Sequence, residues 1–157
     1  MRGAEMTSLI VHAVLGVVVI GFIMKSNPTI FRSATPAVSG LEALLYVIGV
    51  ASIPLCWYFN YRFVAEYGAA QTNPFVGPGS WMEFIKLGYA NPASSSASAD
   101  YTIANVLLLP LFTIIDGRRR GIHRPWLYFV ASLFTSFAFS WAFYLATVER
   151  QRRLGTV

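Results

Sequence analysis

Four apolar runs separated by short polar segments constrain this chain more than any other feature of its sequence. They cover residues 7–24, 41–60, 92–116 and 126–148. As helices, each is long enough to cross the roughly 30 Å hydrocarbon core of a bilayer, the first only without tilt. Only 12% of the residues are charged and 55% are hydrophobic, whereas soluble domains carry about 25% charged residues. The sequence therefore predicts an all-α integral membrane protein, a four-helix bundle formed by a single transmembrane domain.

The first run, residues 7–24, is interpreted as a membrane span rather than a cleaved signal peptide. Only Arg2 provides positive charge before it, and Lys25 follows it with no small-residue cleavage site close behind. His12 lies within the run and is interpreted as a packing residue. The alternative is a ligand or a proton relay, because ionisable groups inside membranes tend to be functional.

The polar segment 65–90, between the second and third runs, contains a short amphipathic piece. Ser80 offers an N-cap for residues 81–87. The apolar side chains that can share one face there are Trp81, Phe84 and Ile85. The sequence predicts a short interfacial helix between spans two and three, and a lid over a binding site is the alternative.

The third run begins at Asn91-Pro92, a pair that starts helices because Asn caps and Pro fits the first turn. Its purely apolar part, residues 101–115, extends only about 22 Å as a helix, so it needs length from the Ser/Ala stretch before it. A helix from Pro92 to Asp116 reaches across. Asp100 then lies two turns inside the helix, where a carboxyl group needs a partner or a wet cavity, or stays protonated.

Asp100 and Asn105 are the candidate catalytic residues if the protein is an intramembrane acid–base enzyme. Such an enzyme, of cyclase or isomerase type, would act on an apolar isoprenoid or lipid. Asp100 would donate a proton from a buried site that raises its pKa, and Asn105 would line the same cavity with His12 or Asp116. In the alternative interpretation, serines cap Asp100 at a helix contact that small residues allow to be close.

No catalytic motif supports the enzyme hypothesis. The sequence contains no GxSxG, no HExxH and no glycine loop for phosphate, so we favour a function without catalysis, with no cofactor and no metal. Cys56 is the only cysteine, which excludes an internal disulfide, and we interpret it as a small buried residue.

A dense basic loop follows the third run. Its arginines are interpreted as a topology signal and as contacts with lipid headgroup phosphates. They are Arg118, Arg119, Arg120 and Arg124. Local pairing with Asp116 and specific binding of an anionic ligand are the alternatives. Because the cations lie beside apolar spans, the net charge of +5 predicts membrane lipids rather than nucleic acid as partners.

The fourth run, residues 126–148, carries Ser132, Ser136 and Ser140 at intervals of four, which predicts a small-residue face for close helix packing. Such faces indicate a membrane-protein partner or a homo-oligomer. Four crossings place both termini on one side and divide the 12 Lys and Arg six against six. The positive-inside rule then leaves the orientation open, and the density of the arginine loop favours placing that loop in the cytoplasm.

Several motifs resemble those of a family of small bacterial multi-pass membrane proteins known only as a domain of unknown function. They are Asn91-Pro92-Ala93-Ser94, Asp100, Asp116-Gly117-Arg118-Arg119 and Trp126-Leu127-Tyr128. The resemblance covers residues 41–150, with the first span as an addition, and Asp116 stands where the family often has Glu. It implies a helical bundle in a bacterial inner membrane and no particular activity. The acid-ended third helix is also similar to small membrane proteins of carotenoid and terpenoid metabolism.

These observations predict a non-catalytic accessory subunit or a lipid-binding protein. The acid–base enzyme is the alternative, and an oligomeric channel or carrier is the third hypothesis. No internal repeat is evident, which argues against an inverted-repeat transporter.

Overall fold

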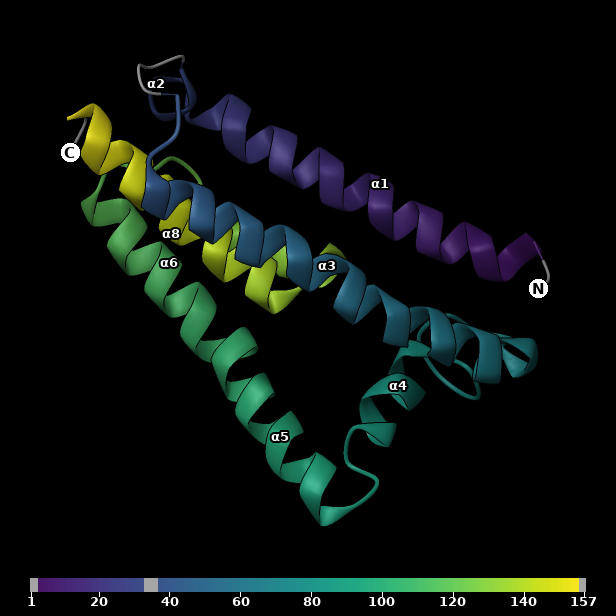
Figure 1. The fold of residues 1–157 in the computed structure, drawn as a ribbon. Coiled ribbons are helices and arrows are strands. Elements are labelled where there is room, and N and C mark those ends of the chain that lie inside the picture. The colour runs from purple at the N-terminus through teal and green to yellow at the C-terminus, as the bar shows by residue number, and fades with distance from the viewer. Residues whose placement is uncertain (1–2, 33–36, 156–157) are drawn as a thin grey trace.

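The computed structural model describes residues 3–32 and 37–155, with side chains from residue 9 onward (Figure 1). This part of the chain contains helices and no strand. The helices are α1 (Gly3–Ser26), α2 (Pro28–Phe31), α3 (Gly40–Tyr67), η1 (Gly68–Ala70), α4 (Trp81–Leu87), α5 (Pro92–Thr102), the π-helix η2 (Ile103–Leu108), α6 (Leu109–Arg119), α7 (Leu127–Phe134) and α8 (Phe137–Leu154). The predicted all-helical class is confirmed.

Three of these helical stretches are long and apolar enough to cross a membrane. They contain Leu9–Ser26, Gly40–Ala70 and Pro92–Arg119. Large apolar side chains on all three face outward, and Val17, Leu55 and Leu107 are each more than half exposed. Exposed apolar surface on this scale suits a lipid environment and not water.

The third of these stretches is continuous from Pro92 to Arg119. Its predicted start is confirmed, because the Asn91 side chain accepts a hydrogen bond from the Ser94 amide at 3.0 Å. The helix passes Pro110 by widening into the π turn, in which the Leu109 amide bonds the Ala104 carbonyl five residues back. The wider turn leaves room for the proline ring, which would otherwise meet a carbonyl of the preceding turn.

The single helix expected over residues 126–148 is divided in two in the structure. α7 ends at Phe134, and α8 begins at Phe137 and runs back antiparallel beside it. Tyr128 Oη near the start of α7 donates to Thr147 Oγ1 near the end of α8 at 2.8 Å. The expected single face of serines therefore does not form: Ser132 lies in α7, Ser136 in the turn and Ser140 in α8.

Local side-chain hydrogen bonds explain this break. The Thr135 hydroxyl donates to the Ala131 carbonyl at 2.7 Å and competes with the helical bonding of the last turn of α7. Ser136 then adopts an extended conformation, and its hydroxyl oxygen accepts from the Phe139 amide at 2.9 Å as the N-cap of α8. A Thr-Ser pair thus ends one helix and starts the next without Gly or Pro.

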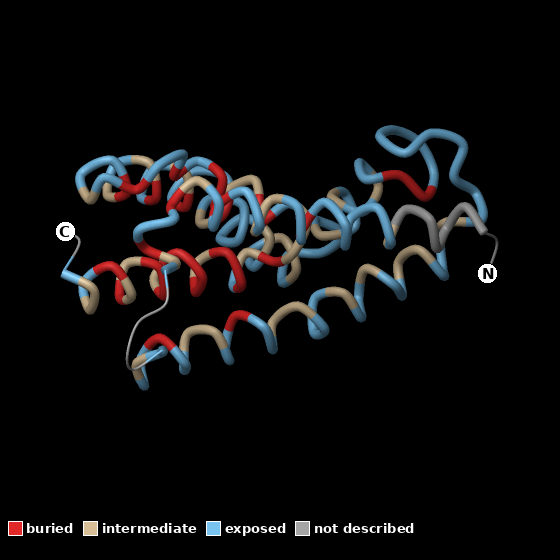
Figure 2. Tube along the Cα trace, turned by 90° about the horizontal axis from the view of Figure 1, so that it is seen from above, coloured by how far each residue is buried: buried red, intermediate tan, exposed pale blue. Residues whose placement is uncertain are grey.

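The α7–α8 hairpin forms the centre of the packing. α1 covers α7 and α3 covers α8, and Tyr128, Phe143 and Tyr144 are buried between them. Gly49 allows α3 to approach closely, because a Cβ at this position would lie 3.3 Å from Cβ of Ala142. Buried residues gather along the hairpin, while α1 is mostly exposed (Figure 2).

The hairpin also brings the end of α8 to the end of the molecule where α1 and α6 finish (Figure 1). Arg150 Nε donates to the Ile30 carbonyl at 2.8 Å, and Gln151 Nε2 donates to the Arg120 carbonyl at 2.6 Å. We call this the basic end, because nine Lys and Arg lie there: Lys25, Arg32, Arg118, Arg119, Arg120, Arg124, Arg150, Arg152 and Arg153.

Among the described residues, the opposite end of the molecule carries two basic residues, Arg62 and Lys86. The expected division of six against six depended on α8 returning to that end. In the structure the division is nine against two, because the hairpin reverses the chain.

The short helix predicted over residues 81–87 is confirmed as α4 (Trp81–Leu87). Ser80 is buried, and its hydroxyl oxygen accepts from the Glu83 amide at 3.3 Å, as expected for an N-cap. The Phe84 ring packs edge-on against Phe63 of α3 with centroids 5.2 Å apart. α4 is thereby fixed to the end of α3, and Trp81 remains exposed.

Candidate functional site

The end of α6 carries a polar network centred on Asp116. Its Oδ2 atom accepts hydrogen bonds from Arg120 Nε and from Tyr144 Oη, both at 2.7 Å. The local pairing expected between Asp116 and the arginines is therefore present, with Tyr144 of α8 as an additional partner. Gly117 lets the following loop fold back, because a Cβ there would lie 2.6 Å from Cβ of Pro125.

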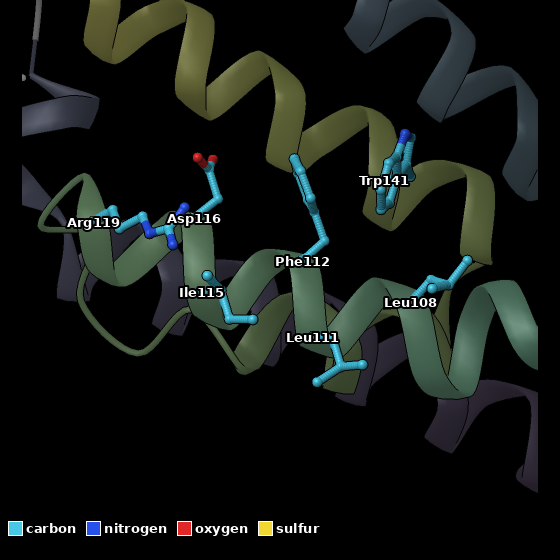
Figure 3. Close-up of a pocket in the computed structure, with 7 residues that line it drawn as sticks. All are labelled: Leu108, Leu111, Phe112, Ile115, Asp116, Arg119 and Trp141. Atoms are coloured by element: carbon cyan, nitrogen blue, oxygen red, sulfur yellow. The ribbon is translucent and has the colours of Figure 1, made fainter.

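A groove of about 460 Å³ follows the adjacent face of α6 (Figure 3). Its lining residues are Leu108, Leu111, Phe112, Ile115, Asp116, Arg119 and Trp141. Those from α6 and the residue before it recur every three or four positions, so the groove runs along the helix axis. Trp141 of α8 forms the facing wall, with its ring centroid 5.2 Å from that of Phe112. The groove is apolar along most of its length and charged at the Asp116–Arg119 end.

A second hollow, of about 410 Å³, lies between the end of α1 and the loop before α7. It is lined by Phe22, Lys25, Ser26, His123 and Arg124. The Arg124 guanidinium lies 5.9 Å from the centroid of the Phe22 ring. No acidic side chain contributes to this lining, so the hollow is a basic one.

The four arginines predicted to contact headgroups lie in different surroundings. Arg118, Arg119 and Arg124 are exposed. Arg120 is half-buried, and its hydrogen bond to Asp116 raises the pKa of its guanidinium further above the ordinary value. Arg120 therefore neutralises Asp116, while the other three present their charge outward.

A buried ion-pair network at the basic end was not predicted from the sequence. Glu42 is fully buried, and its carboxylate accepts from Arg150 Nη1 at 2.9 Å and from Arg153 Nη2 at 3.1 Å. Tyr46 Oη donates to the same carboxylate at 3.2 Å. The local signal was the Ser39–Glu42 capping box, which marks the start of α3. Nothing in the sequence points to arginines more than a hundred residues away.

The structure places the two candidate catalytic residues in different environments. Asn105 is buried, donates to Tyr101 Oη at 3.0 Å and accepts from Ser132 Oγ at 2.9 Å. Asp100 is exposed on α5, and its carboxylate forms no hydrogen bond or ion pair with any residue that the structure describes. Asp100 therefore does not share an enclosed cavity with Asn105. His12 packs elsewhere, with its ring 5.9 Å from that of Phe134.

The exposure of Cys56 and the arrangement of possible metal ligands bear on two further predictions. Cys56 is exposed on α3, so the expectation of a buried cysteine is wrong; α8 covers only one face of that helix. Within residues 3–32 and 37–155, no group of three or more His, Cys, Asp or Glu gathers in a way that could hold a metal ion.

The fold and its polar end define a class: a helical protein with three stretches able to cross a membrane. The chain belongs to the family described as protein of unknown function DUF2834, which it matches over residues 44–150. Comparison with curated proteins and with solved structures gave no match. The family expected from the motifs is confirmed. The match begins inside α3, so α1 and α2 lie outside it, as the sequence predicted for the first span.

Proposed function

We propose that the protein is a non-catalytic lipid-binding protein of a bacterial inner membrane, alone or as the accessory subunit of a larger complex. The observation that carries the proposal is the groove between α6 and α8, which is apolar along most of its length and charged at one end. The groove is open along one side, since Leu108 and Leu111 are more than half exposed, so a lipid in it would also contact the surrounding bilayer. A lipid chain fits the apolar part, and the headgroup then lies beside Arg119.

The charges around the groove favour an anionic headgroup. Asp116 is already held by Arg120 and Tyr144, so its negative charge is balanced inside the protein. Arg119 lines the groove and is exposed, as is Arg118 beside it. Exposed arginines at the membrane surface attract anionic lipids.

In this proposal the chain crosses the membrane with α1, α3 and the α5–α6 helix, and the α7–α8 hairpin enters from the basic end only part of the way. α7 is only about 12 Å long, too short to cross. The polar groups of the hairpin turn have partners within the protein, as groups at membrane depth require. Trp57 Nε1 donates to the Thr135 carbonyl at 3.3 Å, and the Ser52 and Ser136 hydroxyls are 2.7 Å apart.

The positive-inside rule places the basic end in the cytoplasm, because nine of the described basic residues lie there and two lie at the opposite end. The cytoplasmic leaflet is also a source of anionic lipids for Arg119. α4, with its exposed Trp81, then lies in the opposite interface.

The test is the amount of lipid that remains bound when the full chain is purified in mild detergent, measured by mass spectrometry. Leu111→Trp fills the groove and Arg119→Gln removes its charge, so both variants should retain less lipid than the wild type. Leu55→Trp and Arg62→Gln make the same changes on exposed positions of α3 and should retain the wild-type amount. Equal lipid in all five proteins would contradict the proposal.

An oligomeric channel or carrier is the second candidate, and the hairpin is the observation that favours it. Broken helices whose ends meet within the membrane line pathways in several transport proteins. One chain of this size needs other copies to enclose a pathway. Crosslinking that detected oligomers, together with ion flux in liposomes, would support this function, and a monomer without flux would exclude it.

The acid–base enzyme is the third proposal, with Asp100 as the proton donor. The exposure of Asp100 and its separation from the buried Asn105 argue against it. Replacement of Asp100 by Asn should then abolish conversion of an isoprenoid or lipid substrate in membranes. An unchanged lipid and pigment profile in the Asp100→Asn strain would rule it out.

A further inference from the structure

The basic hollow between α1 and the loop before α7 is a second site, separate from the groove on α6. Lys25 and Ser26 come from the end of α1, and His123 and Arg124 come from the loop. Lys25 and Ser26 also end the apolar stretch Leu9–Ser26. The hollow therefore lies at the level where a membrane-crossing α1 would leave the hydrocarbon core, which is the level of lipid phosphates.

The hollow is fixed by one buried side chain, that of Asn27. Its Nδ2 atom donates to the Ile23 carbonyl at 2.9 Å and to the His123 carbonyl at 3.1 Å, and its Oδ1 atom accepts from the His123 amide at 2.7 Å. The Asn27 amide also bonds the Met24 carbonyl at 3.1 Å. These bonds occupy two carbonyls in the last turn of α1 and reduce their exposed partial negative charge next to the hollow.

The loop holds Arg124 in an unusual conformation. Its φ of 54° lies in the left-handed region, which a residue with a Cβ adopts only at an energetic cost. The next residue is Pro125, which disfavours the right-handed helical conformation for Arg124. In this conformation the guanidinium lies over the Phe22 ring, and Lys25 lines the same hollow. The two cations are thus brought together by the fold.

We propose that this hollow binds the phosphate of an anionic phospholipid headgroup, with Lys25 and Arg124 as its cationic ligands and Ser26 as a hydroxyl donor. The lining contains two positively charged side chains, Lys25 and Arg124, and no Asp or Glu that would neutralise them. A zwitterionic lipid would bring an ammonium group for which the lining offers no anion. An anionic lipid such as phosphatidylglycerol brings the phosphate without an ammonium group, and the exposed Phe22 in the lining offers an apolar contact.

The site extends the proposed lipid-binding function but does not depend on the groove. Three of its five lining residues belong to α1, which lies outside residues 44–150 matched by the family. The site therefore depends on α1 as well as on the part of the chain that matches the family.

Native mass spectrometry of the full chain tests the proposal by titration with phosphatidylglycerol, with phosphatidylcholine as the zwitterionic counterpart. Lys25→Gln and Arg124→Gln should each weaken phosphatidylglycerol binding about fivefold, the expected effect of one basic residue near the membrane surface. Lys25→Arg keeps the charge and should bind as the wild type does. Lys86→Gln removes an exposed cation at the opposite end and is the matched control.

Unchanged phosphatidylglycerol binding in both Gln variants would overturn the inference. Competition by inorganic phosphate at equal concentration would overturn the assignment to a lipid, since a soluble anion would then occupy the site. Leu111→Trp separates the two proposals. If Leu111→Trp retains as much lipid as the wild type while Lys25→Gln and Arg124→Gln bind phosphatidylglycerol more weakly, only the groove proposal is contradicted. If Leu111→Trp retains less lipid while Lys25→Gln and Arg124→Gln bind phosphatidylglycerol as the wild type does, only the proposal for the basic hollow is contradicted.

Discussion

The two ends of the molecule are held together in different ways. At the basic end, hydrogen bonds join segments far apart in the sequence, as between Asn27 and His123 or between Arg150 and Ile30. At the opposite end the side-chain bonds are local: Arg62 pairs with Glu66 one helical turn away, and Ser98 donates to the Gly88 carbonyl. The same residue types therefore contribute different amounts to the free energy of unfolding at each end, because their burial and the sequence separation of their partners differ.

This difference bears on function. Both hollows considered for lipids lie at or toward the basic end, where α1, α3, α6 and α8 are tied together. A ligand site needs groups held in fixed positions, and long-range buried bonds provide this. The opposite end carries fewer charges and its helices diverge (Figure 1).

The largest contrast is expected between two glutamates. Glu42→Ala leaves Arg150 and Arg153 without their buried carboxylate and should cost about 3–5 kcal/mol of unfolding free energy. Glu66→Ala breaks an exposed pair on one helix and should cost no more than about 0.5 kcal/mol. Unfolding of both variants in mixed detergent micelles measures the difference, and equal losses would remove the distinction between the ends.

Two Asn-Pro pairs provide the next contrast. Asn27→Ala removes three side-chain bonds, two to His123 in the loop before α7 and one to Ile23 of α1, and should cost about 2–3 kcal/mol. Asn91→Ala removes only the N-cap of α5 and should cost about 1 kcal/mol. The same unfolding measurement compares them, and a larger loss at Asn91 would be inconsistent with a tightly tied basic end.

Two tyrosine hydroxyls should differ by a smaller amount. Tyr144→Phe removes a hydrogen bond to the charged Asp116 and should cost about 1.5 kcal/mol. Tyr89→Phe removes an exposed hydrogen bond to Thr102 and should cost no more than about 0.5 kcal/mol of unfolding free energy. Thermal unfolding midpoints in detergent should rank the variants in this order. The reverse ranking would show that the bond to Asp116 contributes little.

The smallest effect expected is a dependence on pH. Hydrogen bonds from Arg152 lower the pKa of Glu149 below its ordinary value of 4.5. Because the folded pKa is the lower one, ionised Glu149 stabilises the fold above pH 4.5, and this contribution is lost as the pH falls through the folded value. Glu149→Gln should remove this part of the acid sensitivity. An identical pH profile in the variant would show that the pair with the exposed Arg152 is without effect.

Local signals allowed part of this structure to be predicted. Ser80 and Asn91 cap α4 and α5 where the sequence indicated, since an N-cap depends only on residues within the next turn. The Asp116–Arg120 pair follows from its spacing of four residues on a helix. The resemblance to a family of unknown function, expected over residues 41–150, is matched by a family of that description over residues 44–150.

Features that depend on distant partners could not be predicted. The serines at intervals of four suggested one continuous helix. The turn at Thr135-Ser136 combines local caps, which these residues also form within helices, with bonds to Ser52 and Trp57 of α3 that the sequence does not indicate. Asp100 was placed deep in the membrane by counting back from Asp116. The helix in fact extends to Arg119, about 42 Å in all, so its first turns can lie outside the hydrocarbon core.

The reversal of the chain between α7 and α8 decides on which side of the membrane the C-terminal end of α8 lies, and labelling of single cysteines tests it. In a Cys56→Ala background, an impermeant maleimide added to intact cells should label Phe75→Cys but neither Arg118→Cys nor Arg152→Cys until the cells are lysed. Phe75 and Arg152 are both well exposed, so accessibility in the protein is matched. Labelling of Phe75→Cys and Arg152→Cys together, with Arg118→Cys protected, would indicate a fourth crossing and contradict the account.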